Sequence, residues 1–205
     1  MKKLSVFAVL VIIGTSVAVA ASLAIPWFVD NAPAKNGIPG TVAGVTGIVT
    51  LKSNRTDTVT CSVAYFTQEG YFLGPLAPDN TFTIAPLSAL AFRPVLSDPD
   101  QTIGPDGLPT TTPNTANAGG QEGYQGWLVP DRPKSSDGAP IPGSDDGQGN
   151  EVVDTKSNGS CTISWVGGDQ DIQGQIAYFQ TARKDIAGIT TTTTMSYAHL
   201  LPPGT

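Results

Sequence analysis

Short runs in which apolar and polar residues alternate constrain the fold of this chain most. Between residues 58 and 66, Val59, Cys61, Val63 and Tyr65 alternate with polar or small residues. A period of two is that of a strand with one buried face. Similar short runs occupy 47–52, 81–85, 89–95, 126–129, 161–166, 174–181 and 191–200. With 23 glycines and 17 prolines among 205 residues to form turns, the pattern predicts an all-β, antiparallel β-sandwich.

Local spacing also predicts which runs pair. Residues 47–52 and 58–66 flank a short polar turn and are expected to form a hairpin, and 81–85 and 89–95 a second strand pair. The threonine tract 190–194 has high β-propensity and is expected to lie on an exposed strand.

The N-terminus has the pattern of a signal anchor. Lys2 and Lys3 precede an uncharged run, Leu4 to Ile25, which as a helix would be roughly 33 Å long and could cross a bilayer core of about 30 Å. Trp27 and Phe28 follow at the position of a membrane-interface belt. Residues 1–29 are therefore predicted to be a single transmembrane helix with a cytoplasmic N-terminus. A linker at 30–46 would lead to a periplasmic or extracellular sandwich at 47–205.

Two further features of this run bear on its role. Gly14, Ala18 and Ser22 recur at every fourth residue, a spacing that favours close packing against another transmembrane helix. The sequence Ala18-Val19-Ala20 is also a signal-peptidase pattern, and cleavage there would release a chain that starts at Ala21. Retention of the helix is the favoured interpretation and cleavage is the alternative.

The two cysteines lie on the apolar faces of two predicted strands. In an extracytoplasmic domain an even cysteine count favours a disulfide, here Cys61 to Cys161, and two buried thiols are the alternative. A cysteine in each of two sandwich strands with a tryptophan nearby is similar to the pattern of immunoglobulin-like domains. The order differs, because Trp165 follows the second cysteine rather than lying between the two. The resemblance implies a sandwich of immunoglobulin-like architecture, without family membership.

Residues 97–154 form a long excursion rich in proline and glycine. Loops of this length are either disordered or functional, and this composition favours disorder unless a partner orders the segment. Tyr124, Trp127 and Leu128 are the candidate contacts with such a partner, since aromatic side chains bury a large area. The alternative is that Trp127 belongs to the core on an additional strand.

The sequence contains little catalytic chemistry. His199 is the only histidine, both cysteines have a structural assignment, and no nucleotide, haem or metalloprotease motif is present. Neither a cofactor nor a metal is predicted. Paired aspartates could offer oxygen ligands to Ca²⁺, but none completes a calcium loop and turn residues are the favoured interpretation. These pairs are Asp98 and Asp100, Asp145 and Asp146, and Asp169 and Asp171.

Charge and topology together indicate the class of function. The net charge is −6 and no Lys/Arg cluster exists, which argues against a nucleic-acid partner. The leading hypothesis is a non-catalytic accessory subunit that is anchored in the bilayer by residues 4–25 and packs on other membrane-protein subunits, for example of a respiratory or photosynthetic complex. The alternative is a secreted or cell-surface structural or adhesive sandwich with a cleaved signal peptide, able to polymerise.

Overall fold

The computed structural model describes residues 20–31, 44–95, 128–136, 138–186 and 189–203. Within these ranges the chain is all-β, and no helix there combines the length and apolar character that a membrane span requires. The strands are β1 (Ala20–Val29), β2 (Gly44–Ser53), β3 (Val59–Phe66), β4 (Phe72–Gly74), β5 (Thr81–Ile84), β6 (Ala89–Phe92), β7 (Asn158–Val166), β8 (Ile172–Ile186) and β9 (Ile189–Leu200).

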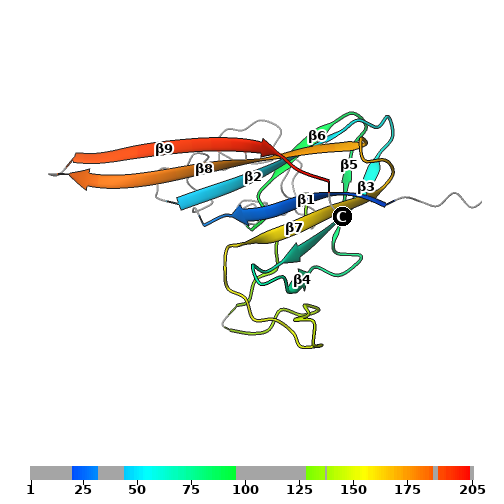
Figure 1. Ribbon diagram of the computed structural model, residues 1–205, viewed down its shortest axis with the longest axis horizontal. Coiled ribbons are helices and arrows are strands. Elements are labelled where there is room, and N and C mark those ends of the chain that lie inside the picture. The colour runs from blue at the N-terminus through cyan, green and yellow to red at the C-terminus, as the bar shows by residue number, and fades with distance from the viewer. Residues whose placement is uncertain (1–19, 32–43, 96–127, 137, 187–188, 204–205) are drawn as a thin grey trace, which may run out of the picture.

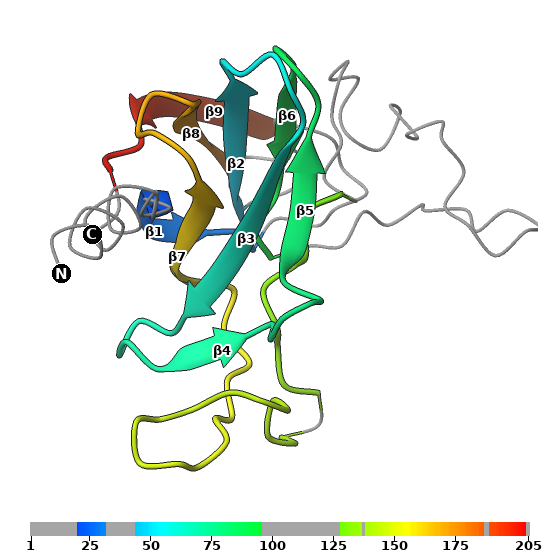
Figure 2. The ribbon, with the colours of Figure 1, turned by 90° about the vertical axis from the view of Figure 1, so that its right-hand side faces the viewer.

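The strands form two antiparallel sheets, seen from two directions in Figures 1 and 2. Sheet A has the order β1-β7-β3-β4, with β5 also paired to β3, and sheet B has the order β6-β2-β8-β9. One core cluster draws side chains from both sheets. The predicted all-β, two-sheet architecture is confirmed.

Both predicted strand pairings are wrong. β2 lies in sheet B and β3 in sheet A, so the turn between them crosses from one sheet to the other. β5 and β6 are likewise divided between the sheets. The physical reason is that alternation identifies the buried face of a strand but not its hydrogen-bonded neighbour.

Residues 20–29, predicted as the end of a transmembrane helix, form strand β1 at one side of sheet A. Leu23, Ile25 and Phe28 are buried in the core, and β1 pairs antiparallel with β7. The predicted helix is therefore wrong for residues 20–29, because apolar content alone does not distinguish a buried strand from a membrane helix. Phe28 is fully buried rather than at a membrane interface, whereas Trp27 is 42% exposed.

The small-residue stripe is only partly within the described residues. Ser22 is half-buried on β1, opposite Ser164 of β7, and does not lie on a helix. Gly14 and Ala18, with the rest of the run before residue 20, lie outside the described residues.

The segment after β1 begins with a buried ion pair instead of an extended linker. Asp30 is 1% exposed, and its carboxylate accepts hydrogen bonds from the Arg93 guanidinium, one of them 2.8 Å long from Nε. Burial raises the pKa of Asp30, and the hydrogen bond and charge of Arg93 oppose that rise. Because Arg93 directly follows β6, the pair joins the end of a sheet A strand to the end of a sheet B strand. Residues 32–43 of the predicted linker lie outside the described residues.

The second half of the long excursion packs on the sandwich near β4. Val129, Ile141 and Val152 are buried in the main core cluster. Phe72 and Asp145 exchange backbone hydrogen bonds of 2.9 and 3.0 Å, which attaches the excursion to β4. The described part of 128–154 thus makes contacts of its own with the core, and its predicted contact with a partner stays a prediction. Residues 128 and 129, the described part of the strand predicted at 126–129, do not form a strand.

Candidate functional site

The two cysteines are buried free thiols in neighbouring strands of sheet A. Cys61 lies opposite Trp165, and Cys161 lies opposite Tyr65. The offset of four residues corresponds to about 13 Å along the strands, far beyond the Cα separation of less than about 7 Å that a disulfide requires. The predicted disulfide is therefore wrong, and the alternative of two buried thiols agrees with the structure. In an immunoglobulin-like domain the bridge would instead join the two sheets.

Burial also disfavours the thiolate form of both cysteines. Desolvation raises the pKa of Cys61 to about 12 and raises the pKa of Cys161 further. Because the thiolate is the reactive form, this shift disfavours nucleophilic reaction of both cysteines in the folded protein.

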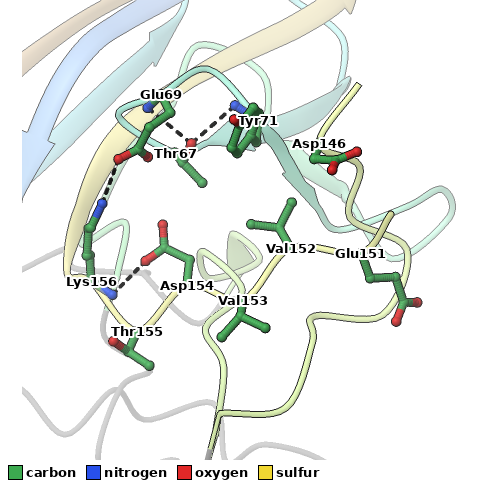
Figure 3. A pocket seen from close by; sticks show the side chains of 10 residues that line it. All are labelled: Thr67, Glu69, Tyr71, Asp146, Glu151, Val152, Val153, Asp154, Thr155 and Lys156. Carbon is green, nitrogen blue, oxygen red and sulfur yellow. Dashed lines mark hydrogen bonds and ion pairs between the residues drawn. The ribbon is translucent and has the colours of Figure 1, made fainter. Parts of the chain in front are cut away.

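An open pocket of about 480 Å³ lies between the β3–β4 turn and the segment 151–156 (Figure 3). Its wall carries Glu69 and Lys156, which form an ion pair of 2.8 Å with each side chain more than 40% exposed. The hydrogen bond from Lys156 is the main reason that the pKa of Glu69 is lowered to about 2. Because both side chains are exposed, solvent screens this pair and it adds little to stability.

The other acidic groups of the pocket are engaged by the chain itself. Asp146 accepts hydrogen bonds from the Asn150 side-chain amide and from the backbone N–H groups of Gln148 and Asn150. The Asn150 side chain first, and then these two N–H groups, lower the pKa of Asp146. Glu151 accepts a hydrogen bond of 3.3 Å from the Gly143 N–H. These contacts hold the carboxylates as turn-stabilising acceptors, in agreement with the interpretation of Asp146 as a turn residue.

Beneath the pocket lies a buried ion pair. Arg132 and Asp154 are 0% and 4% exposed, and Nη2 of the arginine is 3.0 Å from the carboxylate. Nη1 of Arg132 also donates to the carbonyl oxygens of Pro133 and Lys156, both at 3.0 Å. Burial lowers the pKa of Arg132, and the Asp154 charge opposes this shift. The pair fastens two separate stretches of the excursion to each other.

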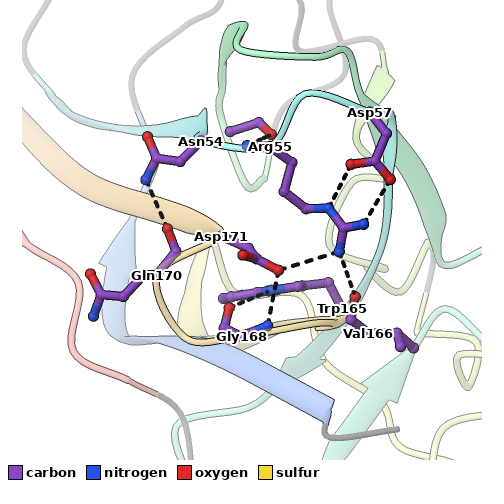
Figure 4. Close-up of polar contacts among 9 residues, drawn as sticks. Asn54, Arg55, Asp57, Trp165, Val166, Gly168, Gln170 and Asp171 are labelled. Atoms are coloured by element: carbon purple, nitrogen blue, oxygen red, sulfur yellow. Dashed lines mark hydrogen bonds and ion pairs between the residues drawn. The ribbon is translucent and has the colours of Figure 1, made fainter.

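A second polar cluster fastens the two sheets together at one end of the sandwich (Figure 4). Arg55, in the β2–β3 turn, donates two hydrogen bonds to Asp57, of 2.9 and 2.7 Å, and one of 3.3 Å to Asp171 in the β7–β8 turn. Asp171 also accepts from the Gly168 N–H at 2.9 Å. Asp171, considered above as a calcium ligand, is thus a partner of an arginine and of the backbone.

The remaining predicted site residues are dispersed. Leu128 is half-buried and lines a cavity of about 200 Å³ beside the β5–β6 turn. Tyr124 and Trp127 lie outside the described residues, as do Asp98 and Asp100.

His199 is exposed on β9, and its ring lies 6.0 Å from that of Tyr178. Among the residues that the structure describes, no three His, Cys, Asp or Glu side chains gather closely enough to hold a metal ion.

Sequence reasoning missed the four long-range ion pairs among the described residues, which are Asp30–Arg93, Arg55–Asp171, Glu69–Lys156 and Arg132–Asp154. Asp30 and Arg93 are 63 positions apart, and Glu69 and Lys156 are 87 apart. No local spacing signals such a pair. The chain matches no protein family model, and no match to a curated protein or a solved structure was found.

Proposed function

We propose that this protein is a non-catalytic structural β-sandwich that works outside the cytoplasm, and that residues 1–20 are a signal peptide removed after Ala20. The observation that carries the proposal is the position of β1. The strand starts at the predicted cleavage site, and its alternate side chains Ala21, Leu23 and Ile25 complete the core between the sheets. Cleavage after Ala20 would remove only the first residue of this strand and leave Ala21–Val29 in place.

The competing hypothesis of a membrane-anchored accessory subunit receives less support. Ile25 and its neighbours on β1 cannot lie in a bilayer and in the sandwich core at the same time. Without β1 the apolar run is reduced to residues 4–19, and these 16 residues would give a helix of about 24 Å, shorter than a bilayer core of about 30 Å. An anchor would therefore require β1 to leave the core.

The polar groups favour a structural role over a catalytic one. The acidic residues around the open pocket are held by Lys156, by Arg132 or by turn N–H groups. The cluster around Arg55 joins loops of both sheets. These contacts fix the shape of the domain, which is what a structural module or an adhesive surface needs.

The test is to secrete the full chain from a bacterial host and determine its N-terminus and intact mass. We expect a chain that begins at Ala21 and leaves the cell envelope without detergent. The double variant A18L/A20L should retain residues 1–20, because bulky residues block the small-residue pattern, whereas the matched variant V19L should be processed normally. A parent chain that keeps Met1 and requires detergent for extraction would overturn the proposal.

A further inference from the structure

The free edges of the two sheets are protected to very different degrees. The C-terminal segment covers the outer edge of β1, where the Ala24 N–H donates to Pro202 at 3.0 Å and Leu23 forms a bridge with Pro203. The edge of β4 is covered by the bridge between Phe72 and Asp145. β5 and β6 are only four residues long. Such coverings and short lengths are the usual protection of sheet edges against unwanted strand pairing.

The outer edge of β9 has no comparable protection within the described part of the chain. β9 is 12 residues long, which corresponds to about 37 Å, and its pairing with β8 continues without a bulge from Leu200 to Ile189. Its sequence, ITTTTTMSYAHL, contains neither a charged residue nor proline. In an antiparallel pair, every second residue of a strand points its backbone N–H and C=O toward the partner strand, and the residues between point theirs away. About half of the residues of β9 therefore direct both groups away from β8.

β9 also carries apolar side chains beyond the limit of the core. Tyr197 lies opposite Tyr178 of β8, and the two rings stack with centroids 4.9 Å apart. Tyr178 is 4% exposed and belongs to the main core cluster, whereas Tyr197 and Met195 are each 61% exposed. The apolar inner face of sheet B therefore continues onto β9, where its side chains Met195 and Tyr197 are largely exposed. Figure 1 shows that the β8–β9 hairpin also extends past the ends of the other strands.

We propose that the edge of β9 binds a second copy of this chain, with the two β9 strands antiparallel about a two-fold axis. Sheet B of one copy would then continue directly into sheet B of the other, in the order β6-β2-β8-β9-β9-β8-β2-β6. The proposal rests on the proposed function, since it gives a structural module its mode of assembly. Met195 and Tyr197 of both copies would lie on one face of the joined sheet.

Charge is the reason to assign the edge to a second copy. The full chain has a net charge of −6, and the chain from Ala21, which lacks Lys2 and Lys3, has 9 − 17 = −8. Two copies therefore repel each other over most approaches, whereas β9 offers an uncharged surface 12 residues long. Antiparallel pairing of a strand with its own copy is self-complementary, and the threonines and aromatic residues of β9 are suited to cross-strand pairs. Because β9 has no charged group, a charged partner has nothing on this edge with which to form an ion pair.

Sedimentation equilibrium of the purified chain that starts at Ala21 tests the proposal. We expect a reversible monomer–dimer equilibrium that strengthens as NaCl rises from about 0.02 to 0.15 M, because salt screens the repulsion between the acidic copies. The variant T193K/M195K places lysines on the proposed interface and should weaken dimerisation at least about tenfold. The matched control V153K/V166K makes the same charge change at exposed positions away from β9 and should still form dimers.

Amide hydrogen exchange of the unmodified protein provides a second readout that does not depend on any variant. Exchange at residues 191–200 should slow as protein concentration rises through the dimerisation range, while exchange in β1 stays constant. A monomer at all concentrations, an unchanged dimer in T193K/M195K, or protection elsewhere than β9 would overturn the proposal. Failure of the proposed function is separately visible as an uncleaved N-terminus that requires detergent, because self-association is measured here on the chain from Ala21.

Discussion

The substitution Ile25→Ala tests whether β1 is part of the folded core. Ile25 is 0% exposed and lies opposite Cys161 in the middle of the β1–β7 ladder. The change removes three carbon atoms, which lowers the free energy of unfolding by about 2.4 kcal/mol at about 0.8 kcal/mol for each buried carbon. The cavity left behind adds to this loss, and the total should be about 3 to 4 kcal/mol.

The assay is urea denaturation of the chain that starts at Ala21, at one fixed protein concentration, followed by tryptophan fluorescence. Trp165 is 3% exposed in the folded protein and becomes solvated on unfolding, so its emission reports the transition. With an m-value of about 2 kcal/mol/M, the urea midpoint should fall by about 1.5 to 2 M. The matched truncation Val166→Ala, at a residue that is 66% exposed, should change stability by less than about 0.5 kcal/mol.

Equal midpoints for Ile25→Ala and the parent, with an unchanged m-value, would refute the reasoning. That result would mean that β1 contributes no packing to the domain. It would also restore the hypothesis that these residues serve a membrane anchor.

Three further predictions concern backbone space, buried charge and thiol reactivity. Gly159→Ala places a Cβ 2.4 Å from the carbonyl oxygen of Phe66, at the end of β3. The control Gly149→Ala adds a Cβ that meets nothing within 4 Å. The midpoint of thermal unfolding of Gly159→Ala should therefore lie well below that of Gly149→Ala. Asp154→Ala should lower the free energy of unfolding by about 3 to 5 kcal/mol because Arg132 stays buried without its carboxylate. The same change at the exposed Asp57 should leave the urea midpoint close to that of the parent, and similar urea midpoints for the two variants would contradict this. Both cysteines should resist iodoacetamide at pH 8 in the folded protein and both should react in urea without a reductant, as intact mass will report; a mass that shows no alkylation in urea would indicate a bridge instead.

The sequence predicted the buried faces of the strands well and their partners poorly. The alternation in residues 59–65 identifies the buried side chains of β3, and the threonine tract identifies an exposed strand. The prediction was wrong where a membrane helix and a buried strand have the same apolar sequence pattern. The apolar run that ends at Ile25 fits a membrane helix by length, yet its last residues alternate between buried and half-buried positions on a strand.

For the candidate sites, the sequence could exclude familiar motifs but could not find the contacts. Cys61 and Cys161 both lie on apolar faces as predicted, and only their register shows that they are four residues out of alignment. The Glu69–Lys156 pair and the two buried ion pairs join residues that no local pattern relates.

The sequence by itself determined the all-β class, because period-two alternation between frequent turn residues leaves few other ways to bury apolar side chains. It also determined that β9 is uncharged, since that property needs no coordinates. Only the tertiary structure decided which strands are neighbours, that Ala20–Val29 completes the core, and that β9 is the long edge left uncovered among the described strands. The physical reason is that alternation specifies which face of a strand is buried, whereas the neighbours of a strand depend on contacts between residues far apart in the chain.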